Sequence, residues 1–183
     1  MCQYPEVTTI EIPRPTSGDV VALILADHRL FEDLLHLLRD ETQDRVAVRA
    51  ALADVLAAHA EAEERHVYPA LVRKRAVDEE DVEHSTHEHL EVNEALVGLL
   101  EVTDVRSDDF DEAVENLTRV LAHHLDEEER EILNPARTDV PEETRAELGA
   151  RFADERNRQL DAGAGALANV SRLIDEERKR ASA

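Results

Sequence analysis

The stretch HAEAEER at residues 59–65 returns, with small changes, as HLDEEER at residues 124–130. In both copies a glutamate follows a histidine four residues later, a spacing that stacks the two side chains one turn apart on the same helix face. Apolar residues precede each copy at the same helical spacing, so this face is expected to be the buried one. The repetition predicts a chain built from two related pairs of helices.

A lone histidine stands before each copy, also on an apolar helix face. The inward rows contain Ile24, Phe31, Leu35 and Leu38 around His28, and Val92, Leu96 and Leu99 around His89. A single histidine on an apolar face is more often an ordinary core residue, but a shared register favours a common site. Six polar side chains are therefore expected to meet in the core: His28, His59, Glu63, His89, His124 and Glu128.

The energetic cost of burying these groups points to bound cations. An unpaired buried carboxylate or imidazolium costs several kcal/mol, against a total stability of about 5–15 kcal/mol. Six ligands exceed what one tetrahedral zinc needs and suit two ions that share carboxylates, with open positions for water or substrate. The absence of sulfur among the ligands favours iron or manganese over copper(I).

The composition is acidic and favours helices. The 183 residues carry 21 Lys and Arg against 43 Asp and Glu, a formal net charge of −22. This charge repels phosphate, so neither nucleic acid nor an anionic membrane is expected as a partner. Aromatic residues make up 3% of the chain and there are five glycines, too few for a β-sandwich or barrel. An all-α protein is predicted.

The first residues of the chain and its apolar runs indicate where in the cell the protein is expected. The single cysteine, Cys2, excludes an internal disulfide, and the first residues lack the basic start and apolar core of a signal peptide. The longest apolar run, Val20–Ala26, is far shorter than the roughly 20 residues that span a membrane. A soluble cytoplasmic protein, monomeric or dimeric, is expected.

Helical periodicity and turn residues predict the boundaries of the helices. Four long helices are expected: one capped by Thr16, Ser17 or Asp19 and running to about Asp40, then 45–75, 78–102 and 107–133. Pro69 should kink or end the second helix locally, and Pro135 should stop the fourth.

The helices group into three parts of the chain. The expected parts are an extended lead-in at 1–16 with Pro5, Pro13 and Pro15, an up-down-up-down four-helix bundle at 17–137, and a helical extension at 138–183. The extension should consist of a helix from Pro141 to about Leu160, a break at 162–165 and a short helix to about Lys179.

The arrangement of a histidine, HxxxE, a histidine and HxxxE resembles the hemerythrin-like HHE cation-binding domain. The phrases DHRLFEDLL, HAEAEERHVYPAL, EHLEV and HHLDEEEREILNP are similar to its four helix signatures and cover roughly residues 17–137. The resemblance implies a non-haem di-iron centre, two iron ions joined by an oxo, hydroxo or water bridge. It further implies that Glu63 and Glu128 bridge the irons, while the four histidines at 28, 59, 89 and 124 are terminal ligands.

The chain departs from the oxygen-carrying members of that family. Those proteins have an additional histidine four residues before the one at His89, where this chain has Ser85, and HxxxxD in the fourth helix. The ligand set is similar to that of the His-HxxxE-His-HxxxE subgroup, which is associated with peroxide breakdown, nitric oxide chemistry or iron sensing. His84 stays a weaker candidate ligand, and the choice among His84, His87 and His89 is open at this point. His36, His66 and His123 are expected to be solvated or to lie outside the ligand set. The acidic runs Glu79–Asp81 and Asp126–Glu129 are expected to form mostly solvated faces, apart from Glu128.

Three functions are compatible with this pattern. The favoured one is an oxidoreductase that reacts with hydrogen peroxide or nitric oxide, in a site with apolar walls from Ile24, Phe31, Leu56 and Leu121. The second is a module that binds or senses O₂ or iron without turnover, and the third is a structural zinc or manganese bundle. A ferritin-type site fits Glu63-xx-His66 but fails in the fourth helix, which has Val120 and Leu121 three residues before its histidines.

Overall fold

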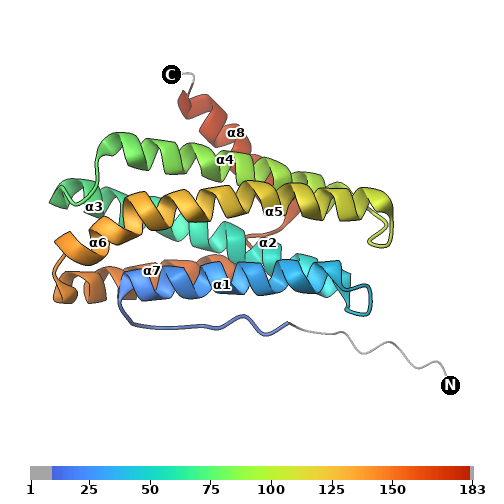
Figure 1. Ribbon diagram of the computed structural model, residues 1–183, viewed down its shortest axis with the longest axis horizontal. Coiled ribbons are helices and arrows are strands. Elements are labelled where there is room, and N and C mark those ends of the chain that lie inside the picture. Colours follow the sequence, from blue (N-terminus) through green and yellow to red (C-terminus); the bar gives the residue numbers. More distant parts are fainter. Residues whose placement is uncertain (1–9, 182–183) are drawn as a thin grey trace.

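The computed structural model describes residues 10–181, and this part of the chain is helical, with no strand (Figure 1). The elements are α1 (Val20–Arg39), α2 (Arg45–Ala62), η1 (Glu63–Val67), α3 (Tyr68–Lys74), α4 (Glu79–Glu101), α5 (Asp108–Glu128), η2 (Glu129–Leu133), α6 (Asn134–Asp139), α7 (Glu142–Asp161) and α8 (Leu167–Ala181). The predicted all-α class is confirmed. Residues 1–9 of the lead-in, with Cys2 and Pro5, lie outside the described residues.

Side-chain caps explain where the long helices begin. Asp19, one of three candidates, caps α1 by accepting a hydrogen bond from the backbone N–H of Val21. Ser107 caps α5 in the same way by accepting from Phe110, at 3.2 Å. These contacts satisfy helix N–H groups that have no partner within their own helix.

Helices α1, α4 and α5 run along the length of the molecule, and α5 lies beside both of the others (Figure 1). Helix α1 packs on α2, α4 packs on α5, and the two pairs meet through contacts of α1 with α5 and of α2 with α4. Two apolar clusters fill the interior, and the chain passes from one to the other within single helices. On α1, Ile24 belongs to one cluster and Phe31 to the other, and His28 lies between them. The polar side chains thus occupy a layer between two apolar cores.

A π-helical turn lies just before each of Pro69 and Pro135, and the prediction that Pro135 ends the fourth helix is wrong. Pro135 does not stop the fourth helix, which continues through η2 and α6 to Asp139. Proline has no N–H and clashes with the carbonyl four residues earlier, and a π-turn displaces that carbonyl from the ladder. Pro135 then stands in the first turn of α6, where no donor is required. Pro69 has the same position after η1, which confirms a local disruption there.

The extension folds back onto the bundle. Helix α7 packs against α1 and α2, and α8 packs against α4. The predicted break is confirmed between them: Gly163 adopts the left-handed region at φ 68°. Gly165 passes so close to α2 that a Cβ atom would lie 2.2 Å from the backbone nitrogen of Asp54. Within the described residues, no helix has the length and apolar character needed to cross a membrane.

Candidate metal centre

The six side chains expected in the core are all buried, and none is more than 4% exposed. They come from four separate segments: His28 from α1, His59 from α2 with Glu63 at the start of η1, His89 from α4, and His124 and Glu128 from α5. Their burial agrees with the helical register of the sequence.

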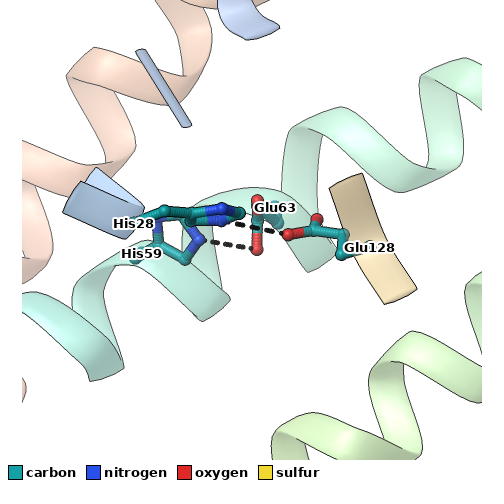
Figure 2. A group of neighbouring side chains, drawn as sticks. All are labelled: His28, His59, Glu63 and Glu128. Atoms are coloured by element: carbon teal, nitrogen blue, oxygen red, sulfur yellow. Dashed lines mark ion pairs between the residues drawn. The ribbon is translucent and has the colours of Figure 1, made fainter. Parts of the chain in front are cut away.

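Two histidines and both glutamates form the middle of the cluster (Figure 2). The Nε2 atom of His28 lies 3.2 Å from Oε2 of Glu128, and Nε2 of His59 lies 3.1 Å from Oε2 of Glu63. One ligand atom from each of these four residues lies within 4.8 Å of the other three. This spacing is short enough for the four groups to share metal ions.

The other two histidines adjoin this group on the side of α4 and α5. The Nε2 atom of His89 lies 3.5 Å from Oε2 of Glu63, the same oxygen that faces His59. The ring of His124 stands edge-on to that of His89, with centroids 4.6 Å apart. Glu63 therefore lies between histidines from the two pairs of helices.

Five inward-facing atoms of the centre have no hydrogen-bond partner among the described residues. These atoms are Nε2 of His28, His59 and His89, together with Oε1 of Glu63 and Oε2 of Glu128. A buried polar atom without a partner costs about 1–3 kcal/mol, so five in one layer call for a compensating group. Nitrogen and oxygen donors this close together suit divalent or trivalent cations, and the residues present fit such ions.

The outward-facing nitrogens are all occupied. In each of the four histidines Nδ1 donates a hydrogen bond to a carboxylate. The pairs are His28 with Glu129 (2.9 Å), His59 with Asp27 (3.0 Å), His89 with Glu64 (3.0 Å) and His124 with Glu88 (3.1 Å). A hydrogen on Nδ1 leaves the Nε2 lone pair for a metal, and this arrangement is usual for metal-binding histidines.

The comparison with known families agrees with this geometry. The model of the hemerythrin HHE cation-binding domain matches residues 19–136. The chain belongs to that family. No curated protein and no solved structure matches the chain.

The extension contributes a buried ion pair to this hemerythrin domain. Arg156 of α7 is fully buried and binds both oxygens of Asp27, at 2.6 and 2.7 Å. Asp27 in turn orients His59, and Phe152 of α7 lies edge-on against the same imidazole. Helical periodicity does not predict this contact, because Arg156 lies far from Asp27 in the chain and outside the matched region.

Tyr68 joins the two glutamates. Its hydroxyl donates to Oε1 of Glu128 at 2.8 Å and lies 3.4 Å from Oε2 of Glu63. In an α-helix, residues five apart do not share a face, but the π-turn of η1 brings Tyr68 near Glu63. A tyrosine directly before Pro69 and shortly after HxxxE is the sequence signal that could have indicated this role.

The carboxylates strongly favour positive charge at the centre. Burial lowers the pKa of His59, but Glu63 and Asp27 outweigh it and raise that pKa to about 10. Burial likewise lowers the pKa of His89, and Glu63 and Glu64 raise it to about 10. Burial also lowers the pKa of His28, but the nearby carboxylates, mainly Glu128, outweigh it and raise that pKa.

The pKa values of Glu63, His124 and Tyr68 are shifted too, in directions that keep the glutamate anionic and the other two side chains neutral. Burial raises the pKa of Glu63, but His59 and His89 together hold it well below its ordinary value, so the carboxylate stays ionised. Burial lowers the pKa of His124, which favours its neutral ring. Burial, with the nearby Glu128 charge, raises the pKa of Tyr68 far above its usual range and keeps the phenol protonated.

The remaining histidines lie away from the centre. His84, the weaker candidate ligand, is exposed, and its Nε2 atom lies 2.8 Å from Glu127. The helical register turns His84 and His87 outward, and His89 is the buried histidine of α4. His36 and His123 are exposed and His66 is half-buried, as expected. Glu129, in contrast, was expected only as part of a solvated run, yet it binds the imidazole of His28. Glu64 was given no role in the sequence analysis and binds the imidazole of His89.

A small pocket adjoins the centre. Phe31, Leu56 and Leu121 line it together with His59, His89 and His124, whereas Ile24 does not line it. The cavity has a volume of about 10 Å³. By this measure it has room for roughly one water molecule. Such a pocket admits small molecules and excludes larger ones.

Proposed function

We propose that this hemerythrin domain is a di-iron protein whose six buried ligands are His28, His59, Glu63, His89, His124 and Glu128. In this proposal α1, α2 with η1, α4, and α5 with η2 are the four helices of the up-down-up-down family bundle, over residues 17–137. The supporting observation is the set of buried ring nitrogens and carboxylate oxygens that face one another without hydrogen-bond partners.

The proposed roles are those that the family resemblance implies. Glu63 and Glu128 would bridge the two ions; one oxygen of Glu63 lies 3.1 Å from His59 and 3.5 Å from His89, which supports this role for Glu63. The four histidines would be terminal ligands through Nε2. Iron held by these residues would supply reversible one-electron redox chemistry and would bind a small ligand.

The chain itself supplies selection and proton control. The apolar pocket beside His59 and His89 restricts access to molecules near the size of water. Tyr68 keeps a proton on its hydroxyl, directed at Glu128, and the four outer carboxylates hold each imidazole in one tautomer. These features favour a small molecule as substrate. We propose a small oxidant, with hydrogen peroxide as the first candidate and nitric oxide as the second.

The reaction we propose is catalase-like: two H₂O₂ give two H₂O and one O₂, with one peroxide reduced and the other oxidised. Iron-loaded protein is expected to evolve O₂ steadily from peroxide at an oxygen electrode. His59→Ala and Glu128→Ala should abolish this activity, whereas His87→Ala, at an exposed position of α4, should retain it. Full activity in both ligand variants, or none in iron-loaded wild type, contradicts the proposal. Spectral changes on adding nitric oxide in place of peroxide would identify the second substrate.

A binding or sensing role without turnover is the second candidate. The observation that favours it is Arg156, which links α7 of the extension to His59 through Asp27. A change at His59 on ligand binding could thereby reach the extension. An O₂ sensor predicts reversible O₂ binding by the iron-loaded protein, and an iron sensor predicts reversible iron binding by the iron-free protein. In both cases no O₂ should be released from peroxide.

A further inference from the structure

A second group of metal-binding side chains lies on the outer side of α4 and α5. We call it the outer cluster; it consists of His84 and Glu88 from α4 with His123 and Glu127 from α5. The Nε2 atom of His84 lies 2.8 Å from Glu127 and 3.7 Å from Oε1 of Glu88, and Nε2 of His123 lies 3.5 Å from the same Glu88 oxygen and 3.9 Å from Glu127.

These distances match the ligand spacing around a small cation. Zinc binds imidazole and carboxylate at about 2.0–2.1 Å, so two ligands of a tetrahedral site stand about 3.3 Å apart. The four nitrogen-to-oxygen distances in the outer cluster lie on both sides of this value. Ligand atoms of His84, Glu88 and Glu127 also lie within 4.8 Å of one another.

Glu88 provides an independent sign of a missing ligand. Its side chain is only 4% exposed, and its Oε1 atom has no hydrogen-bond partner among the described residues. That atom is directed at His84 and His123, while Oε2 accepts the hydrogen bond from Nδ1 of His124. A buried carboxylate oxygen without a partner is costly, and a cation in the outer cluster would satisfy it.

The equivalent carboxylate in the other half of the protein already has a cation. Asp27 directly precedes His28 and binds Nδ1 of His59, just as Glu88 directly precedes His89 and binds Nδ1 of His124. Both oxygens of Asp27 are held by the guanidinium of Arg156. No described arginine or lysine takes this place at Glu88, where the two exposed imidazoles stand instead.

We infer that the outer cluster is a second metal site, which binds one first-row divalent cation such as Zn²⁺ through His84, Glu88, His123 and Glu127. The site is open to solvent on the side of the two histidines. Glu88 would join it to His124, so that occupancy of the outer site alters the carboxylate that orients this histidine. Only this last link depends on the proposed function of the buried centre.

Calorimetric titration of iron-loaded, full-length protein with ZnCl₂ tests the site. Wild type is expected to bind one Zn²⁺ per chain more than the double variant His84→Ala/His123→Ala. The single variant Glu127→Gln should bind that ion at least about tenfold more weakly, since loss of an outer partner alone costs about that much. His87→Ala is the matched control and should bind as wild type does, because His87 forms an exposed pair with Glu91 on the same helix.

The result is separable from the fate of the buried centre. The three variants and wild type share that centre, so the difference between them reports the outer cluster even in protein that holds no iron. Equal Zn²⁺ stoichiometry and affinity in wild type and the double variant would overturn the inference, as would a wild type that binds no Zn²⁺. Circular dichroism checks that the double variant is folded, which is expected since both histidines are exposed.

Discussion

The two halves of the domain use the same set of contacts in the same order. In each half, the acid before the lone histidine binds the histidine of HxxxE in that half, as Asp27 binds His59 and Glu88 binds His124. The acid after the glutamate of HxxxE binds the lone histidine of the other half. These crossed contacts are Glu64 with His89 and Glu129 with His28. The repeat therefore extends beyond the proposed ligands to the carboxylates that orient the histidines.

The halves differ on their outer sides. In the first half, α7 covers His59 with Phe152 and neutralises Asp27 with a buried arginine. In the second half, Glu88 faces the outer cluster and solvent-exposed imidazoles. The carboxylate that orients a histidine of HxxxE is thus paired with an arginine of the chain in the first half. In the second half it faces two exposed imidazoles, where we propose an exchangeable cation.

The largest expected effect is loss of metal on removal of either glutamate. Glu63→Ala and Glu128→Ala should each release at least half of the bound iron, because each carboxylate is proposed to serve both ions. Elemental analysis of the purified variants measures this. Similar losses of iron in the two variants would support equivalent roles for the two glutamates. Retention of all iron in one variant would show that the two halves are not equivalent.

Removal of the buried guanidinium should be the most destabilising change outside the ligands. Arg156→Met removes the guanidinium and leaves the buried Asp27 carboxylate with the hydrogen bond from His59. It is expected to lower the free energy of unfolding by about 3 kcal/mol, the low end for breaking a buried ion pair. Urea denaturation of the metal-free protein measures the change. Arg158→Ala is the control in the same helix: its side chain is 60% exposed, so its loss should cost less than about 1 kcal/mol. Equal costs for the two variants would refute a special role of α7 at the first half.

Tyr68→Phe should have an intermediate effect that does not distinguish the halves. The variant removes the donor to Glu128 and should lower the free energy of unfolding by about 1–3 kcal/mol. The same urea experiment applies. A neutral result would show that the phenol does not stabilise the glutamate pair.

The smallest effects are expected at the crossed contacts. Glu64→Gln and Glu129→Gln should each weaken metal binding by about tenfold, the low end for such partners, because an amide oxygen still accepts the hydrogen bond. Competition with a chelator measures the affinities. Since Glu129 is 46% exposed and Glu64 is 23% exposed, the variant at Glu64 should be affected at least as much as that at Glu129.

Helical periodicity predicted the buried layer well because it depends only on which face a residue occupies. The burial of His59 and Glu63 follows from their spacing from Leu52 and Val55, and the start of α5 follows from Ser107. Local patterns of this kind are contained in a few consecutive residues.

The missed features depend on contacts that periodicity does not encode. The pairing of Asp27 with Arg156 joins two helices distant in sequence, and Glu129 looked like one member of a solvated acidic run. Pro135 suggested a helix end, but a π-turn directly before it accommodates the proline within a continuing helix. Such a turn has no simple sequence signature, so it was not predicted. The approach of Tyr68 to Glu63 depends on the same kind of turn.

Anomalous diffraction at the iron edge from crystals of the iron-loaded, full-length protein tests the central claim most directly. The account predicts two peaks between Glu63 and Glu128, one bordered by His28 and His59 and the other by His89 and His124. A map with no peak between the two glutamates, and with their side chains paired to the imidazoles alone, would contradict it.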